Sequence, residues 1–325
     1  MCSRVSRVLI GGCLVLAGCS SGGQDAEVVF ESEGAVNIVG PVVSDGDSIW
    51  WLTEVADDSR ALEVVKADSG TGVIEWSEPV GFGTVFPLFL DDGVLWVQVN
   101  SPESPDESDH DLVRVDAESG EVTGEVPTES YGVAVVDDLL WTVDGFSVLD
   151  LVDPSTPELV ESLSLYDVES LDFEPSFASD AIEFDDAVWV TSQNRAFGLN
   201  PDTLELIDSV EFPAGGFGRL EIQDGVLWAQ ETDRLKESDL PYSALKIDTE
   251  SATTETFDLY ESPVGTVEYN GFTFDVTGEN KVEQIDASGE TVATYENLDP
   301  FSFVVTDGYL WAVNEDQVVR YPTAG

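Results

Sequence analysis

A short acidic run between residues 106 and 111 holds the densest group of potential metal ligands in the sequence. It consists of Asp106, Glu107, Asp109, His110 and Asp111 around one serine. Carboxylate oxygens are the ligands that Ca²⁺ prefers, so the run could hold this cation. The spacing matches no standard Ca²⁺ loop, however, and His110 is the single histidine of the chain. A Ca²⁺ site therefore stands beside the alternative of a solvated acidic loop, in which case no cofactor is expected.

Arg219 is a second candidate, because basic residues are rare in this chain. Twelve Lys and Arg residues stand against 66 Asp and Glu residues. Arg219 follows the turn-forming segment 213–218 and begins a predicted innermost strand, where it could bind an anionic ligand or a partner carboxylate. It could equally neutralise a neighbour such as Glu221. Aromatic residues near the starts of inner strands would complete a ligand-binding surface, namely Phe82, Tyr131 and Phe217.

These candidates must be positioned by a repeated unit in which a tight acidic turn runs into an apolar strand with a Trp. The clearest copy is Asp91-Asp92-Gly93-Val94-Leu95-Trp96-Val97. Related copies begin at Asp45, Asp137, Asp185, Asp224 and Asp307, and a degenerate copy at Asn270 carries Phe274 in place of Trp. The aromatic anchors are 37 to 48 residues apart. Seven units of this length predict a β-propeller.

Each unit predicts four antiparallel strands. An innermost strand precedes the acidic turn, and the Trp strand follows it. A third strand ends in a second acidic turn, such as Asp116-Ala117-Glu118-Ser119-Gly120, and an outer strand completes the unit. No stretch has a sustained helical period, so the fold class is all-β. We expect the Trp rings, which can each bury about 200 Å², to form the core between blades rather than carbohydrate platforms.

The two ends of the chain are predicted to complete one blade together. The last unit has strands near 303–306, 309–313 and 318–321 but no outer strand after them. Segment 27–32 precedes the first unit and has no unit of its own. We expect it to become the missing outer strand, because closing the ring removes exposed sheet edges. Residues 26–325 would then be one domain, a monomeric seven-bladed β-propeller of four-stranded antiparallel blades.

The first 18 residues resemble a bacterial-type lipoprotein signal peptide. Arg4 and Arg7 form a positive region, residues 8–16 are mostly apolar, and Leu16-Ala17-Gly18-Cys19 resembles a lipobox. The resemblance implies cleavage before Cys19 and lipidation of its thiol, with residues 19–25 as the lipidated Cys and a linker. A membrane-spanning helix would need about 20 apolar residues, roughly twice the length of this run. We therefore expect a lipid-anchored protein on the extracytoplasmic face of the cell membrane.

The charge of the chain excludes electrostatic attraction to nucleic acid or to anionic lipid. The formal net charge is −54, and the loss of two Arg with the leader makes it −56. The acids are spread through nearly every turn, and apolar residues are too frequent for a disordered polyacid. We interpret the excess as the adaptation of a folded surface to concentrated salt. Contact with the membrane would then be made through the lipid anchor alone.

With these motifs, the chain from residue 26 to residue 325 resembles the pyrroloquinoline-quinone-type and streptogramin-lyase-type (YVTN-type) repeat propellers. Such repeats occur in quinoprotein dehydrogenases, in lyases and in envelope lipoproteins that bind other proteins, so the fold alone does not select a function. The resemblance to the lyases would imply a catalytic His and a metal, for which His110 alone is a poor set. Nothing in the chain matches the extended cofactor loops of the dehydrogenases.

Loop lengths predict where a partner binds. Both kinds of acidic turn are short and fall on one face of the propeller, whereas the longer loops 101–111, 167–179 and 231–240 fall on the opposite face, as does Arg219. We expect an envelope protein or a small ligand to bind this long-loop face. The chain would act as a binding or scaffolding module without catalytic residues. The alternatives are a metal-dependent lyase or hydrolase and loops that have no partner.

Salt should stabilise the folded chain. Like charges on its surface repel one another, and the Debye length falls from about 10 Å at 0.1 M salt to about 3 Å at 1 M. The thermal unfolding midpoint should therefore rise between about 0.1 M and about 2 M KCl. A non-ionic osmolyte at matched osmolality is the control. A midpoint that stays flat or falls in KCl would contradict the interpretation of the acids as salt adaptation.

Overall fold

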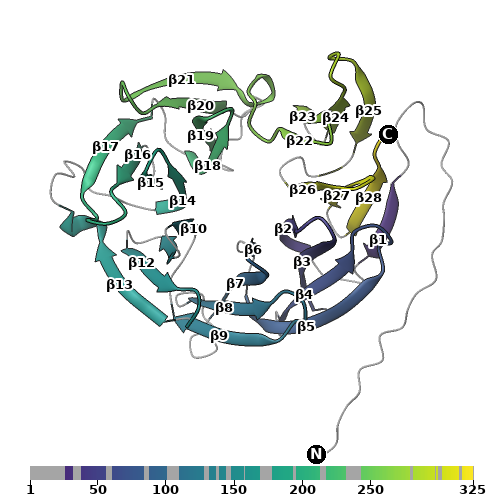
Figure 1. Cartoon of the computed structure of the whole chain (residues 1–325), viewed down its shortest axis with the longest axis horizontal. Coiled ribbons are helices and arrows are strands. Elements are labelled where there is room, and N and C mark those ends of the chain that lie inside the picture. Colours follow the sequence, from purple (N-terminus) through teal and green to yellow (C-terminus); the bar gives the residue numbers. More distant parts are fainter. Residues whose placement is uncertain are drawn as a thin grey trace, which may run out of the picture.

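The structure is a computed structural model that describes residues 26–31, 38–55, 61–83, 88–100, 110–127, 132–136, 139–143, 148–156, 158–168, 178–192, 195–212, 217–231, 243–278, 281–296, 298, 302–314 and 317–324. Antiparallel sheets surround a common centre (Figure 1). Within the described ranges, helical structure is limited to two 3-10 turns, η1 (Leu165–Asp167) and η2 (Leu259–Glu261). The all-β prediction is confirmed.

Five sheets have four antiparallel strands each. Four of them run in chain order from the centre to the rim: β10 (Gly132–Val136), β11 (Leu139–Val143), β12 (Val148–Asp153) and β13 (Glu158–Ser164); β14 (Ala178–Phe184), β15 (Ala187–Ser192), β16 (Arg195–Leu199) and β17 (Leu206–Glu211); β18 (Phe217–Gln223), β19 (Val226–Glu231), β20 (Ser243–Asp248) and β21 (Thr253–Asp258); and β22 (Val267–Tyr269), β23 (Phe272–Gly278), β24 (Lys281–Ile285) and β25 (Thr291–Glu296). We call such a set of four strands a unit.

The fifth four-stranded sheet joins the two ends of the chain. It contains β26 (Phe303–Thr306), β27 (Tyr309–Asn314), β28 (Gln317–Pro322) and β1 (Glu27–Glu31). β1 pairs antiparallel with β28, so that Glu27 is opposite Arg320 and Glu31 is opposite Gln317. Figure 1 shows the purple β1 beside the yellow β28. The predicted closure of the ring by the N-terminal strand is confirmed.

The remaining sheet has eight strands. They are β2 (Ile38–Ser44), β3 (Ser48–Glu54), β4 (Ala61–Asp68), β5 (Ile74–Phe82), β6 (Leu88–Asp91), β7 (Val94–Asn100), β8 (His110–Asp116) and β9 (Val122–Pro127). The sets β2–β5 and β6–β9 are joined by a single residue pair between Phe82 and Asn100. The count of seven blades depends on dividing the sheet at this pair, and it stays a prediction.

The acidic turn between the first two strands of a unit is formed by residues with positive φ. In the β6–β7 hairpin, Asp92 has a φ of 41° and Gly93 a φ of 76°. The β18–β19 and β22–β23 hairpins repeat this pair with Asp224-Gly225 and Asn270-Gly271. Two consecutive positive φ values fit a type I′ turn, whose twist matches that of the flanking strands. The copy predicted at Asp137-Asp138 lies outside the described residues.

The second acidic turn, after the third strand, is held by its own Asp. Asp68 Oδ1 accepts bonds from Thr71 N and Thr71 Oγ1, both at 2.6 Å, and these bonds hold the pKa of the Asp68 carboxyl below its ordinary value. Ser69 N donates to Asp47 O at 2.9 Å in the first turn of the same unit. The two kinds of short turn therefore lie side by side on one face, which we call the short-turn face.

The core lies between neighbouring units. The Trp residues predicted to be core are buried, with exposed fractions of 0 to 5% in the described second strands: Trp50, Trp51, Trp96, Trp141, Trp189, Trp228 and Trp311. Trp50 Nε1 donates to Ala117 O at 3.2 Å in the next unit, and Trp311 Nε1 donates to Ser69 O at 3.2 Å across the closure. Apolar clusters likewise span two units, such as Trp50 with Leu95 and Val97.

A basic residue of the third strand lies opposite the Trp of the second strand in four units. The Cα pairs are Trp50 with Lys66, Trp96 with Arg114, Trp228 with Lys246 and Trp311 with Arg320. Three of these cations reach the second acidic turn of the next unit. Arg114 Nε donates to Pro154 O at 3.0 Å, and Arg320 Nη1 donates to Gly70 O at 2.8 Å.

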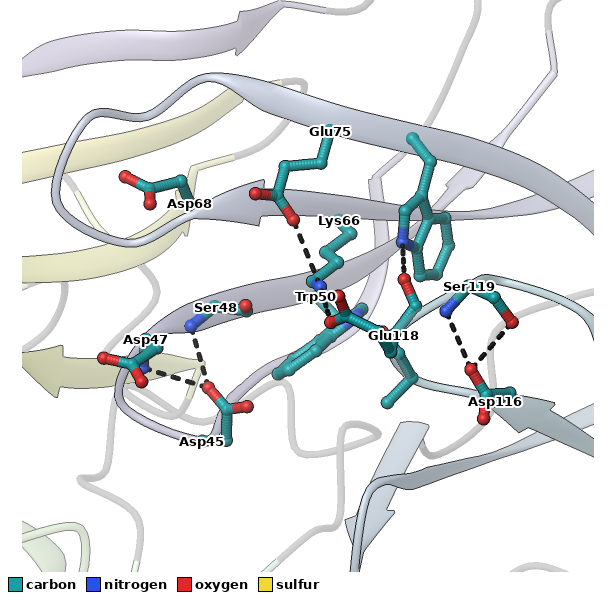
Figure 2. A network of polar contacts seen from close by, with 12 residues as sticks. Asp45, Asp47, Ser48, Trp50, Lys66, Asp68, Glu75, Asp116, Glu118 and Ser119 are labelled. Atoms are coloured by element: carbon teal, nitrogen blue, oxygen red, sulfur yellow. Dashed lines mark hydrogen bonds and ion pairs between the residues drawn. The ribbon is translucent and has the colours of Figure 1, made fainter.

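Lys66 makes the third of these contacts. Figure 2 shows its ammonium between Glu75 of the same unit and Glu118 of the next, with Nζ–Oε2 distances of 3.1 and 2.6 Å. The ammonium also lies 5.7 Å from the centre of the Trp50 ring. Burial lowers the pKa of Lys66, but the hydrogen bonds and charges of Glu118 and Glu75 outweigh it, so the pKa is raised. Lys66 therefore stays charged in the interface.

Candidate functional site

Arg219 lines a cavity among the innermost strands β18, β22 and β26. The cavity has a volume of about 140 Å³, and its wall includes Glu221 and Gln223 of β18, Thr266 next to β22, and Phe303 of β26. Arg219 itself is exposed. It lies near the start of β18, at the end of the strand that is remote from the Asp224-Gly225 turn. This placement agrees with its predicted position at the start of an innermost strand.

Glu221 ties β18 to the next unit. Gly265 N donates to its two carboxylate oxygens at 3.1 and 3.2 Å. Gln223 Nε2 also donates to Glu221, and it donates to Thr266 O at 2.9 Å. Residues two apart on a strand point to the same side, so Arg219 and Glu221 share one face of β18. The cavity wall thus carries a fixed carboxylate beside an exposed guanidinium.

Asp180 of β14 holds the opposite charge at the position equivalent to Arg219. Each of these two residues pairs with the second strand of its unit directly after a register shift, Asp180 with Thr191 and Arg219 with Gln230. Asp180 Oδ2 accepts a hydrogen bond from Leu220 N at 2.7 Å, which links β14 to β18. Neighbouring innermost strands therefore present a carboxylate and a guanidinium at matching positions.

Burial gives the Asp180 carboxyl a raised pKa. Burial raises its pKa from the ordinary 3.8 to about 6. The amides of Leu220 and Ala181 and the positive charge of Arg219 act in the opposite direction and limit the rise. A carboxyl with this pKa changes its charge in a mildly acidic medium. Any anion bound by Arg219 would therefore meet less repulsion from Asp180 as the pH falls below about 6.

Of the three aromatic residues predicted beside Arg219, Phe82 is placed away from it. Phe82 ends the outer strand β5 and is 45% exposed, whereas the next innermost strand, β6, begins at Leu88. β5 and β18 lie on different sides of the ring (Figure 1), so Phe82 does not accompany Arg219. Phe217 begins β18, two residues before Arg219. Tyr131 lies outside the described residues.

Most of the predicted Ca²⁺ ligands lie outside the described residues. Asp106, Glu107 and Asp109 are not among the described residues, and His110 begins β8. Asp111 is buried and shares a hydrogen bond with Glu125, whose pKa is raised by burial and then by this bond and the charge of Asp111. In the part of the chain that the structure describes, no three His, Cys, Asp or Glu side chains are grouped to hold a metal ion.

The predicted membrane anchor and most of the longer loops also lie outside the described residues, including Cys19, 101–109, 169–177 and 232–240. No helix in the described ranges is long and apolar enough to cross a membrane.

The sequence analysis did not predict two features of the structure. The first is Asp180 in the site, and the second is the row of basic residues opposite the Trp side chains at the boundaries between units. Both could have been found by aligning the units with one another. In such an alignment Asp180 falls in the column of Arg219, and Lys66 falls in the column of Arg114 and Arg320.

Comparison with known proteins identifies the fold. No protein-family model and no curated protein matches the sequence. BamB from Moraxella catarrhalis is similar in structure, with a TM-score of 0.52 and 14% identity over 87% of this chain and 82% of that one. The computationally designed Ika8 protein has a TM-score of 0.58 and 12% identity over 93% of this chain and 100% of that one. The Neurospora crassa Pan2 WD40 domain has a TM-score of 0.57 and 9% identity over 89% of each chain.

These similarities, together with the ring of four-stranded sheets, show that the chain is a β-propeller. At such low identity they show nothing about activity or partner.

Asp180→Asn should change how stability depends on pH. The folded pKa of about 6 exceeds the ordinary 3.8, so the folded state holds an extra proton between these values. In the wild type, the cost of the buried carboxylate grows as the pH rises through this window and is complete above it. The free energy of unfolding of Asp180→Asn, relative to wild type, should therefore increase from pH 4 to pH 7, in urea titrations read by fluorescence.

The exposed Asp202→Asn serves as the control, because it removes the same charge from a surface turn. A difference between Asp180→Asn and wild type that does not vary with pH would show that the pKa of Asp180 is not raised in the folded state.

Proposed function

We propose that the chain is a lipid-anchored, extracytoplasmic β-propeller lipoprotein that acts as a binding or scaffolding module. Its partner would be an envelope protein or a small ligand that carries a carboxylate or another anion. The observation that supports this most is the cavity in which exposed Arg219 stands beside Glu221 and near Asp180. A guanidinium forms charge-assisted hydrogen bonds with carboxylates and other anions, so this position selects an anionic group.

The predicted location rests on the sequence. The lipobox at Leu16-Ala17-Gly18-Cys19 supports anchoring through Cys19, and the net charge of −54 supports a protein that touches anionic membranes through its anchor only and binds no nucleic acid. The same charge, spread over the surface turns, supports a monomer adapted to concentrated salt.

We further propose that the propeller has seven blades and belongs to the repeat class typified by pyrroloquinoline-quinone-type and streptogramin-lyase-type propellers. The acidic turn followed by a buried Trp, the second acidic turn and the division of the eight-stranded sheet at one residue pair support this. Binding at the Arg219 end of the innermost strands is consistent with rigid strands presenting side chains next to variable loops.

Charge reversal at Arg219 should remove the partner. The lipidated wild type, Arg219→Glu and Asp92→Arg would each be purified from their own cells with their envelope partners. We expect the same co-purifying species with wild type and Asp92→Arg, and at least about tenfold less of it with Arg219→Glu, because a charge-assisted hydrogen bond contributes about 1.5–3 kcal/mol.

Asp92 is a suitable control because it is exposed on the short-turn face. Cys19→Ala, which lacks the lipid acceptor, distinguishes binding by the propeller from capture through shared membrane. Loss of the partner with Asp92→Arg but not with Arg219→Glu would show that the partner binds the short-turn face, and would contradict the proposal.

A further inference from the structure

The unit β14–β17 departs from the pattern of basic residues opposite the Trp. Trp189 of β15 is paired with Gly198 of β16, at the position that Lys66 and Arg320 occupy in their units. A Cβ at Gly198 would lie 3.0 Å from Trp189 Cε2, because the indole packs directly on the main chain. This unit therefore has no space for a cationic side chain of its own at this position.

A cavity of about 190 Å³ lies beside this pair. Trp189, Asp185, Ile207 and Asp208 of the unit β14–β17 form one wall, and the second acidic turn of the next unit, at Thr249 and Glu250, forms the other. We call this cavity the inter-unit groove. Its wall reaches the short-turn face, because Asp185 and Glu250 belong to the two kinds of short turn. It is therefore separate from the Arg219 cavity.

The carboxylates that hold a cation in other units are both present in the inter-unit groove. Glu250 has the place in its turn that Glu118 has in Asp116-Ala117-Glu118-Ser119, and Glu118 binds Lys66 at 2.6 Å. Asp208 is the Cα partner of Gly198, just as Glu27 is the partner of Arg320, to which it binds at 2.8 Å.

No ion pair joins Asp208 or Glu250 to a basic residue in the described part of the chain. The inter-unit groove thus repeats the acidic surroundings of Lys66 and Arg320 without their cation. Two carboxylates that face a cavity and lack a counter-charge attract a cation from outside.

We propose that the inter-unit groove binds an arginine side chain of a partner protein. The guanidinium would take the role that Arg320 has at the closure of the ring, between the outer-strand carboxylate and the turn of the next unit. There, Arg320 binds Glu27 and donates to Gly70 O at 2.8 Å. The equivalents in the groove are Asp208 and the turn at Thr249 and Glu250.

Arginine fits the groove better than lysine. Its planar guanidinium has five donors and can serve two carboxylates and a carbonyl at once, whereas an ammonium is a compact point charge. Ile207, which is 53% exposed, offers an apolar wall for the methylene groups of the side chain. The partner would therefore present an exposed arginine to the short-turn face.

The test uses calorimetric titration of the full chain with the peptide acetyl-Gly-Arg-Gly-amide in high salt, which suppresses unspecific attraction to the acidic surface. The citrulline peptide, of the same shape but uncharged, is the first control. We expect the arginine peptide to bind and the double variant Asp208→Asn, Glu250→Gln to bind it at least about tenfold more weakly. The double variant Glu158→Gln, Glu290→Gln, which removes two exposed acids elsewhere, should keep the wild-type affinity.

Asp208→Arg is a second test variant, because it places a guanidinium from the outer strand β17 in the groove itself. It should abolish peptide binding and raise the thermal unfolding midpoint, while Arg219→Glu should leave peptide binding unchanged. Failure of the wild type to bind at millimolar peptide, equal binding of the citrulline peptide, equal losses in the two double variants, or unchanged binding in Asp208→Arg would each overturn the proposal. Tighter binding of a lysine peptide would overturn the choice of arginine.

Discussion

The contact on which the ring depends joins the Trp strand and third strand of one unit to the second acidic turn of the next. Trp50 and Trp311 each donate to a carbonyl of the second acidic turn in the next unit. Lys66, Arg114 and Arg320 each reach the equivalent turn of the unit after their own with their charged groups. A four-stranded sheet cannot bury both faces alone, so each unit gains its core from its neighbours. The turn is rigid enough to be a docking point because its own Asp binds the amide and hydroxyl groups around it.

This arrangement explains how so acidic a chain can form tight interfaces. Four of the twelve basic residues lie opposite a Trp. Lys66 lies between Glu75 of its own unit and Glu118 of the next, where it separates carboxylates that would otherwise repel one another across the unit boundary. Buried ion pairs stabilise a fold only when further hydrogen bonds satisfy the charged groups. Arg320 meets this condition: it binds Glu27 and Gly70 O and lies 4.3 Å from the Tyr309 ring centre.

Local patterns were enough to predict the turns, the Trp core and the closure by β1, because each depends on residues that are close in sequence or on the count of strands per unit. The surroundings of the cations were not predictable in this way. They depend on which residue of the third strand is opposite the Trp, and on which turn of the next unit approaches. Asp180 was missed for the same reason, since its partner amide belongs to β18. Phe82 was misplaced because β5 continues for nine residues and ends at Phe82.

The role of contacts between units is tested most directly by comparing the cost of two substitutions of basic residues in urea unfolding. Arg320→Met removes a buried guanidinium that joins β28 to β1 and to the turn at Gly70, whereas Lys281→Met removes an ammonium whose ion pair with Glu283 stays within β24. If contacts between units hold the ring, Arg320→Met should lower the free energy of unfolding by about 2 kcal/mol or more beyond the loss in Lys281→Met. Equal losses in the two variants would contradict it.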